Sequence, residues 1–224
     1  MKDQYFGDVN DYCKYRLLRS LTRSGLSLGV CWMLTEPDGR TDGKHLGYLD
    51  KARHHRQADP ELFEWLQTAI HRDSDRRTAR IEASGLLGDA IFQLRILRDD
   101  SVGRLSYFAH CQELFRGRDL VFFDPDNGLE RSKRPGNRGS SKYVYWPEVE
   151  ATFASGASVL IYQHFPREER TGFIARMKAE LQARTGAAEI EAIRTSHVLF
   201  LFAAHERHRA SIAPTVAAGQ TFYR

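Results

Sequence analysis

The chain has 224 residues, of which 42% are hydrophobic and 11% aromatic, so it can build the core of one sizeable domain, and wholesale disorder is excluded. Its 33 Lys and Arg and 29 Asp and Glu give a formal charge of +4, which favours polyanionic partners without requiring them. No apolar run reaches the roughly 18 residues of a membrane helix, and the first residues show no signal-peptide pattern. The three cysteines lie far apart and are odd in number, which predicts reduced thiols and a cytoplasmic protein, and none has the Cys-x-x-Cys spacing that indicates a structural zinc site.

The first half of the chain predicts helices around one buried strand. Residues 8–24 carry tyrosines and leucines at helical spacing, with Asp8 or Asn10 as the N-cap and Gly25 at the end, and they predict a helix. The apolar run 26–34 predicts a buried strand, and residues 35–43 predict a turn-rich loop. Residues 59–70 and 88–98 predict two further helices, so we expect a helical insertion around residues 50–100 of a single domain that spans residues 1–224.

The second half predicts strands that alternate with helices. Residues 118–123 form the clearest strand, and the glycine-rich, basic segment 129–142 predicts a mobile loop. The pattern then predicts, in order, a helix at 147–153, a strand at 157–163, a helix at 168–185, and a closing hairpin of strands at 190–193 and 198–203. This order predicts an α/β fold: a mainly parallel central sheet with helices on both faces and a C-terminal antiparallel hairpin.

Ligands of such sheets bind outside the carboxyl ends of the strands, so the polar residues that follow each strand are the candidate site. The strongest candidate is the loop Asp124-Pro125-Asp126-Asn127-Gly128, because Pro125 stops the strand and presents Asp124 at its end. A carboxylate or amide oxygen there can hold an exocyclic amine for attack on a methyl donor. Alternatively, Asp124 and Asp126 can ligate Mg²⁺ for phosphoryl chemistry. The same residues also form a common turn with no further role.

Other candidate residues follow the remaining strands or lie near the start of the chain. His164 follows the strand at 157–163 and could carry a proton, although a lone histidine is more often structural. Thr35, Asp38 and Gly39 fit a loop that holds a ligand but match no G-x-G-x-x-G or Walker pattern. Asp8, Asp11 and Lys14 are spaced three residues apart and share one face of the first predicted helix, either as a salt-bridged surface or as the border of a pocket.

Two basic stretches are candidate nucleic-acid contacts. They are residues 51–56 and 131–142, and the second is followed by Tyr143, Tyr145 and Trp146, whose rings could stack on bases. We expect a solvated surface at residues 205–208, because the spacing of their histidines does not match H-E-x-x-H. No G-x-S-x-G is present to indicate a serine nucleophile.

Three segments resemble class I S-adenosylmethionine-dependent methyltransferases, and most closely the bacterial large-subunit rRNA adenine-N6 methyltransferases and the three-Cys-motif partner proteins. Residues 7–15 (GDVNDYCKY) look like that rRNA enzyme's Gly-Asn-x-x-Asp-x-x-Lys-His helix, and residues 120–127 (LVFFDPDN) stand where those enzymes carry a strand and Asp-Pro-Pro-Tyr. The segments 157–164 and 190–203 resemble the last strands of that fold. In this chain Asp126 and Asn127 replace the second proline and the aromatic residue, and residues 35–39 lack the family's glycine-rich pattern.

The resemblance implies a Rossmann-like methyltransferase fold, S-adenosylmethionine as cofactor, and an amino group, such as that of an RNA or DNA base, as substrate. By this resemblance Asp124 would hold the target amine, Pro125 would shape the loop, and Asp8 and Lys14 would border the cofactor pocket. The expected site residues are therefore, for catalysis, Asp124, Asp126, Asn127 and His164; for the cofactor, Asp8, Lys14, Thr35, Asp38 and Gly39; for substrate, Pro125, Gly128, Lys142 and Tyr143.

Two alternatives stay open. Residues 121–126 also resemble the strand-Asp-x-Asp opening of haloacid-dehalogenase-like phosphatases, in which Asp124 would be the nucleophile and Asp126 the acid or base around Mg²⁺. That alternative predicts a metal-dependent phosphohydrolase or nuclease, although Gly128 replaces the threonine that it expects. The other alternative is a non-catalytic protein that binds nucleic acid or a partner.

Overall fold

The structure is a computed structural model that describes residues 2–36, 43, 45–51, 53–73, 76–130 and 133–222, with only the backbone described at residues 51 and 73. Within this part of the chain a six-stranded sheet lies at the centre, with the strand order β2-β1-β3-β6-β8-β7. Its first four strands are parallel, and β8 runs antiparallel to both of its neighbours. The strands are β1 Leu28–Cys31, β2 Ile91–Gln93, β3 Leu120–Phe123, β6 Ser158–His164, β7 Glu189–Arg194 and β8 Val198–Ala204.

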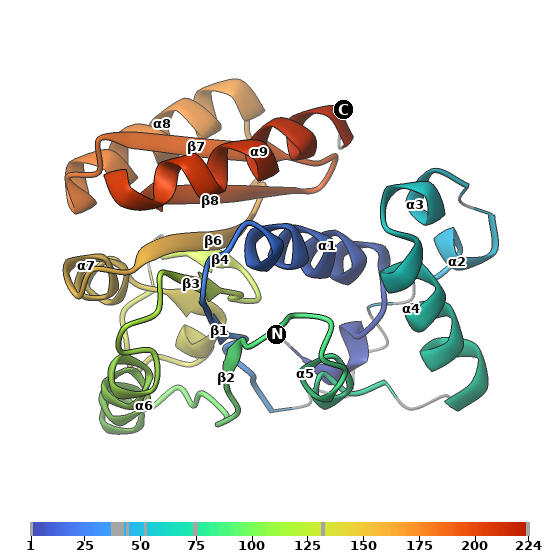
Figure 1. Ribbon diagram of the computed structural model, residues 1–224. Coiled ribbons are helices and arrows are strands. Elements are labelled where there is room, and N and C mark those ends of the chain that lie inside the picture. Colours follow the sequence, from blue (N-terminus) through green and yellow to red (C-terminus); the bar gives the residue numbers. More distant parts are fainter. Residues whose placement is uncertain are drawn as a thin grey trace.

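Helices pack on both faces of this sheet (Figure 1). A separate two-stranded parallel ribbon, β4 with β5, lies next to β6. These elements are α1 Val9–Arg23, α2 Tyr48–Lys51, α3 Arg53–Ala58, α4 Pro60–Asp73, α5 Ala79–Ala83, α6 Ser101–Leu114, α7 Trp146–Ala154, α8 Arg170–Thr185, α9 Glu206–Phe222, β4 Gly128–Leu129, β5 Tyr143–Val144, and the 3₁₀ turns η1 Asp3–Tyr5 and η2 Ser140–Lys142. The predicted α/β fold, with a mainly parallel sheet and a closing antiparallel hairpin, is confirmed at this level.

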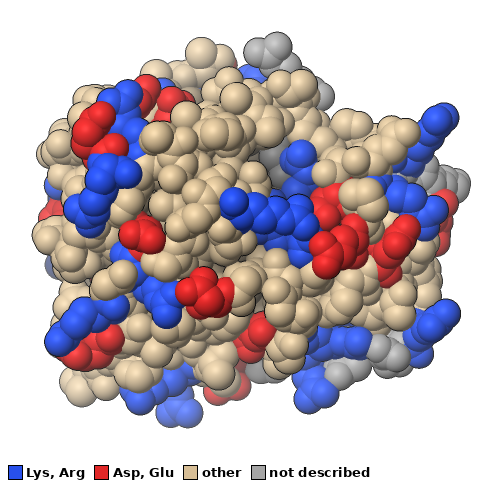
Figure 2. Space-filling model, in the orientation of Figure 1, with Lys and Arg blue, Asp and Glu red and all other residues tan. Residues whose placement is uncertain are grey.

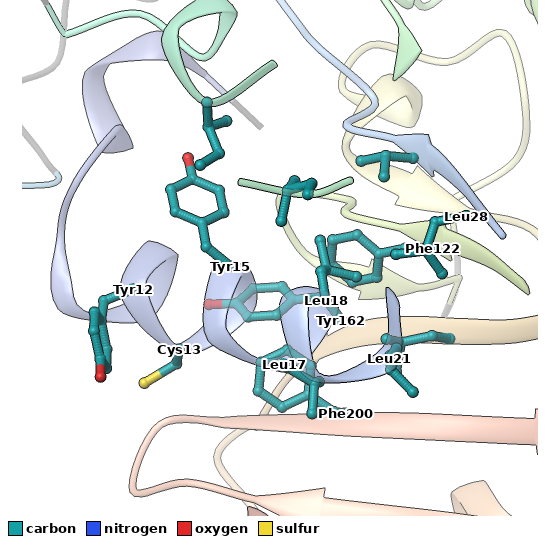
Figure 3. Packing of buried hydrophobic residues seen from close by; sticks show 14 of the residues in the cluster. Tyr12, Cys13, Tyr15, Leu17, Leu18, Leu21, Leu28, Phe122, Tyr162 and Phe200 are labelled. Atoms are coloured by element: carbon teal, nitrogen blue, oxygen red, sulfur yellow. The ribbon is translucent and has the colours of Figure 1, made fainter. Parts of the chain in front are cut away.

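Strand alternation divides the core into two halves. Successive residues of a strand point to opposite faces, so Leu120 and Phe122 pack under α1, whereas Val121 and Phe123 pack against α6. Figure 3 shows the first half, in which Tyr15 and Leu18 of α1 lie over the side chains of β1, β3, β6 and β8. Both faces of the central strands are therefore buried, which explains why their sequences are apolar throughout rather than alternating.

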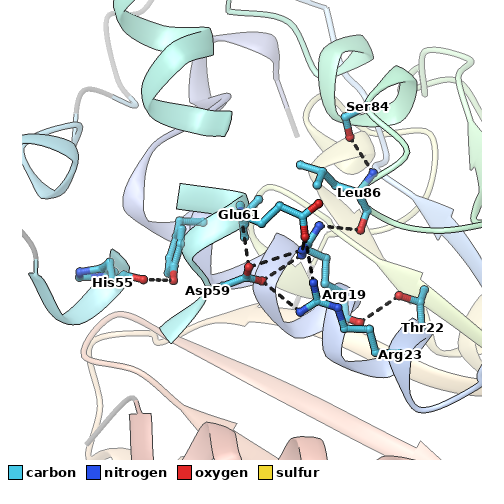
Figure 4. Close-up of polar contacts among 10 residues, drawn as sticks. Arg19, Thr22, Arg23, His55, Asp59, Glu61, Ser84 and Leu86 are labelled. Atoms are coloured by element: carbon cyan, nitrogen blue, oxygen red, sulfur yellow. Dashed lines mark hydrogen bonds and ion pairs between the residues drawn. The ribbon is translucent and has the colours of Figure 1, made fainter. Parts of the chain in front are cut away.

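A buried ion-pair network joins α1 to α4 (Figure 4). Arg19 is only 2% exposed and donates to both Asp59 (2.9 Å) and Glu61 (2.6 Å), and a third bond reaches the carbonyl oxygen of Leu86. Asp59 in turn accepts a hydrogen bond from the amide of Leu62 at the start of α4. The N-terminus of α4 is therefore held against α1 by ion pairs as well as by apolar packing.

One predicted element is wrong and one helix was not predicted. Residues 88–98 are not a helix: they contain the short edge strand β2, paired with β1, and an irregular segment in which the amide of Leu97 donates to the carbonyl of Leu34. Residues 101–114 form the unpredicted helix α6. The solvated face expected at residues 205–208 is present in part: Glu206 and Arg207 are exposed, but His208 is 4% exposed and His205 stacks on Phe153.

The predicted loop 129–142 is held in place over its second half. Asp99 accepts hydrogen bonds from the amides of Gly139 and Ser141, and Arg104 donates to the carbonyl oxygens of Ser140 and Tyr143. Among the residues described, no helix is long and apolar enough to span a membrane.

Candidate functional site

The candidate site lies where the strand order changes direction. From β1 the chain goes first to β2 on one side and then, through α6, to β3 on the other, so the carboxyl ends of β1 and β3 meet at a switch point. The register pairs Cys31 with Phe123, and the amide of Asp124 donates to the carbonyl of Cys31 at 3.0 Å. The predicted loop therefore begins where an open α/β sheet ordinarily binds its ligand. Next to it, Met33 has a left-handed backbone (φ 50°) that non-glycine residues rarely adopt.

Lys14 connects the first helix to this loop. Its Nζ lies 2.9 Å from Oδ2 of Asp124 and 3.2 Å from Oδ1 of Asp11, and all three side chains are almost fully buried. The hydroxyl of Tyr15 donates to Asp11 (3.0 Å), and the ammonium of Lys14 lies 4.2 Å from the ring centre of Tyr162. The arrangement is a buried cation between two carboxylates and an aromatic ring, which holds the Asp124 carboxylate in a fixed orientation.

Burial dominates the protonation of this cluster. It raises the pKa of Asp11 to about 7, against the opposing effect of Lys14. Burial also raises the pKa of Asp8, although its carboxylate caps α1 by accepting from the amides of Asn10 and Asp11. Burial disfavours the charge on Lys14, but Asp124 and Asp11 outweigh it, so the pKa of Lys14 lies well above its ordinary value. At neutral pH the lysine is charged, and Asp11 takes up a proton far more readily than an ordinary aspartate does.

Asp126 belongs to a second ion pair. One of its carboxylate oxygens lies 3.6 Å from Nζ of Lys2. Burial opposes its charge, but neighbouring positive groups that include Lys2 and Lys142 outweigh burial and lower the pKa of Asp126. Each of the two predicted carboxylates is thus matched with a lysine. Among the described residues, no group of three or more His, Cys, Asp or Glu side chains is arranged to hold a metal ion.

Three neighbouring pockets open at this edge of the sheet. The carboxylate pocket, of about 360 Å³, is lined by Asp8, Asp11, Lys14, Asp124, Asp126 and Tyr162, among others. The aromatic pocket, of about 660 Å³, is lined by Tyr143, Trp146, Phe165, Phe173, Arg176 and Arg184, among others. The basic pocket, of about 930 Å³, is lined by Lys2, Thr35, Arg98, Lys133, Arg138 and Lys142, among others.

Asn127 lines all three pockets, so they meet at the loop that the sequence singled out. Although the side chain of Asp124 is 2% exposed, it borders the carboxylate pocket rather than being sealed in the core. The three pockets thus adjoin one another around Asn127, and we refer to them together as the groove.

The structure brings most of the predicted site residues together. The carboxylate pocket contains the following of them: Asp8, Lys14, Asp124, Pro125, Asp126, Asn127, Lys142 and His164. Tyr143 lines the aromatic pocket and Thr35 the basic pocket. Gly128 lines none of the three, because it is buried against the side chain of Gln163. Asp38 and Gly39 lie outside the described residues.

Sequence reasoning missed several residues of the site. Asp11 is expected at most to border a pocket and is not among the predicted site residues, and Tyr162 is predicted only as part of a strand. Arg98 lies inside the segment predicted as a helix, and Asp99 directly follows it. The position of Tyr162 could have predicted its role. It lies two residues before His164 on the same predicted strand, so both side chains point to the same face of the sheet.

A serine–histidine–aspartate arrangement at the opposite edge of the sheet is structural. The Ser158 hydroxyl lies 2.9 Å from Nδ1 of His208, whose Nε2 is 3.3 Å from Asp119. Ser158 is fully buried and also accepts from the amide of His205, so a substrate has no access to its hydroxyl. These side chains connect α9 to the starts of β3 and β6.

In comparisons with known protein families, curated proteins and solved structures, nothing matches this chain. The chemistry of the site is therefore argued from its geometry.

Proposed function

We propose that this protein is a methyltransferase-like enzyme that transfers a methyl group from S-adenosylmethionine to an amino group, with an RNA or DNA base as the substrate class. The observation that carries the proposal is the buried Asp124, which sits at the switch point of a parallel sheet, is oriented by Lys14 and borders a pocket. The parallel sheet with its closing antiparallel hairpin is also what the Rossmann-like methyltransferase resemblance implies.

The donor set of the carboxylate pocket fits such a cofactor. Carboxylates and the ring of Tyr162 suit the sulfonium and ammonium cations of S-adenosylmethionine, and lysines suit its carboxylate. Asp8, Lys14 and Tyr162 are the residues that would hold it. The turn after β1 reads Trp-Met-Leu-Thr-Glu rather than a glycine-rich sequence, so donor recognition rests on the walls of this pocket.

The residues of the cluster have distinct roles in this proposal. When bound, S-adenosylmethionine would supply an electrophilic methyl group. Asp124 accepts a hydrogen bond from the target amine and orients its lone pair, while Lys14 fixes the carboxylate as a positioning residue. Transfer would break the S–C bond of the donor, which would leave as the neutral thioether, and the amine would give up a proton; Asp11, with a pKa of about 7, is the group in the cluster that would take up this proton at neutral pH.

The Mg²⁺-dependent alternative has less geometric support. Asp124 and Asp126 are each within ion-pair distance of a lysine, and a hard cation would have to displace those ammonium groups. The non-catalytic alternative uses the same groove for binding alone.

Calorimetric titration separates these functions. We expect S-adenosylmethionine to bind the wild type, and Asp8→Asn, which keeps the shape of the side chain but removes its charge from the wall of the carboxylate pocket, to weaken binding at least about tenfold. Asp89→Asn is the matched control, because Asp89 is exposed and distant from the pockets. No binding of S-adenosylmethionine by the wild type would overturn the proposal. Mg²⁺ binding that is lost in both Asp124→Asn and Asp126→Asn would favour the hydrolase.

A further inference from the structure

The basic pocket concentrates positive charge at one end of the groove. Its walls carry Lys2, Arg98, Lys133, Arg138 and Lys142, against the two acidic residues Glu36 and Asp99. The Asp99 carboxylate is used internally, since it accepts hydrogen bonds from two loop amides at 2.6 and 2.9 Å. With five basic against two acidic side chains, the lining of this pocket is positive overall.

The wall of this pocket is preorganised. Asp99 and Arg104 hold residues 139–143 through backbone hydrogen bonds, and Lys133 Nζ donates to the carbonyl of Arg138 at 2.7 Å, which closes the loop on itself. A basic loop that is already ordered loses less conformational entropy on binding than a free one. At the inner end, the Thr35 hydroxyl oxygen is buried and has no hydrogen-bond partner among the described residues.

The opposite end of the groove has a different chemistry. The aromatic pocket is lined by the partly exposed rings of Tyr143 and Phe165, with the buried ring of Trp146 behind them and Arg176 and Arg184 also in its lining. The guanidinium carbon of Arg184 lies 5.3 Å from the centre of the Trp146 ring, so this ring already makes a cation–π contact. Asn127 lies at the junction of both ends with the carboxylate pocket that contains Asp124.

We propose that this groove binds single-stranded nucleic acid, with backbone phosphates in the basic pocket and an unpaired base in the aromatic pocket. A nucleotide carries an anion and a planar ring on one unit, and the groove offers cations and aromatic rings on either side of Asn127. A base inside a duplex could not enter the aromatic pocket, because its faces are covered by its neighbours. The role of Asp124 toward such a base rests on the proposed function, whereas the binding of the strand does not need the methyl donor.

The face of the molecule shown in Figure 2 has charges of both signs. On this face Lys and Arg are interspersed with Asp and Glu instead of gathering by sign. The ion pairs on α1 and α4 and within α9 are examples of such mixing. A polyanion therefore meets paired charges over that face.

Fluorescence anisotropy with a fluorescein-labelled single-stranded oligonucleotide tests the proposal directly. Arg98→Gln/Arg138→Gln removes two charges from the basic pocket. The matched control, Arg72→Gln/Arg116→Gln, removes two exposed charges, one on α4 and one after α6, from positions that line none of the three pockets. We expect the first variant to bind at least about tenfold more weakly and to reduce the slope of log affinity against log salt by about 1.4, because a single strand contributes about 0.7 per neutralised phosphate. The control should change affinity less than about twofold.

A second arm tests the aromatic end. Phe165→Leu keeps apolar bulk but removes the ring, and it should weaken binding to a normal strand more than binding to an abasic strand. Three results would each overturn the proposal. They are an equal loss of affinity in the groove variant and the control, a duplex that binds as tightly as the single strand, and poly-glutamate that competes as well as nucleic acid does. Since no methyl donor is present, these results are independent of the calorimetric test of the methyltransferase.

Discussion

Lys14 is the residue on which the candidate site depends most. A buried ion pair gains little net stability when both partners are present, but it becomes costly when one is removed, because the remaining charge is left without compensation. Lys14 compensates two buried carboxylates at once, on α1 and after β3. It therefore couples the first helix to the loop that carries the proposed chemistry.

A double-mutant cycle measures this coupling. Lys14→Met keeps the apolar stem and should lower the free energy of unfolding by about 3–5 kcal/mol. Asp124→Asn alone leaves Lys14 next to Asp11 and should cost less. In the double variant Lys14→Met/Asp124→Asn one uncompensated charge is removed, so part of the stability should return. Urea denaturation of all four proteins gives the cycle, and a Lys14→Met variant within about 1 kcal/mol of the wild type would contradict it.

Asp11 predicts a pH dependence of stability with a definite sign. Its pKa is about 7 in the folded protein against an ordinary 3.8, so between these values the folded state holds a proton that the unfolded state releases. Its contribution is therefore complete below about pH 4 and is lost as the pH rises to about 7.

Urea unfolding at pH 5 and pH 8 tests this sign. Relative to Asp11→Asn, which cannot titrate, the wild type should lose at least about 1.4 kcal/mol over that interval, the equivalent of a one-unit shift. The same slope in both proteins would show that the Asp11 carboxyl is not perturbed.

At the scale of elements, Gly128 fixes how the β4–β5 ribbon meets the sheet. It has a φ of 99°, and a Cβ added there would collide with the side chain of Gln163. That side chain accepts a hydrogen bond from the amide of Leu129 at 2.7 Å, so β4 is held against β6 by this contact. Gly128 therefore has a structural role at this contact.

Gly25 provides a matched control for this role, because its φ of 87° is similar but a Cβ there would meet nothing within 4 Å. Gly25→Ala should cost about 1–2 kcal/mol for backbone strain alone. Gly128→Ala should cost at least about 1 kcal/mol more, because it also breaks the Gln163 hydrogen bond. Equal losses in chemical denaturation would mean that Gln163 moves aside freely.

Asp99 organises the basic loop, and its neighbour Asp100 serves as a control. Asp99→Ala removes the acceptors of the Gly139 and Ser141 amides, whereas Asp100→Ala removes the N-cap of α6, which accepts from Gly103. Hydrogen–deuterium exchange should therefore accelerate at residues 139–141 in the first variant and at the start of α6 in the second. Acceleration of the loop in both variants would show that it is not held by Asp99.

The errors in the predicted elements have a physical cause. Ile91, Leu94 and Leu97 have helical spacing, but Leu94 is 60% exposed, and β2 forms because β1 offers it a partner strand. In α6, Val102 and Leu105 are largely exposed and obscure the apolar stripe. Strands buried on both faces, such as β3 and β6, were predictable because their apolar runs depend little on which neighbour they meet.

At the scale of the whole molecule, the site is a product of topology. Asp124 and His164 were identifiable because each directly follows an apolar strand, and parallel strands place such residues at one edge. The ion pairs of Lys14 with Asp124, which are 110 residues apart, and of Lys2 with Asp126 were not predictable, because sequence spacing does not reveal which side chains meet across elements. The same holds for Arg98, which reaches the groove only because the segment after β2 crosses the end of β1.

Transfer of tritium-labelled methyl groups from S-adenosylmethionine to a random pool of single-stranded RNA and DNA tests the account most directly, because it needs both the Asp124 cluster and the groove. The wild type should label the pool, Asp124→Asn should not, and Arg98→Gln/Arg138→Gln should label it more slowly at limiting substrate. Labelling that persists in Asp124→Asn, or a wild type that labels neither RNA nor DNA, would contradict the account.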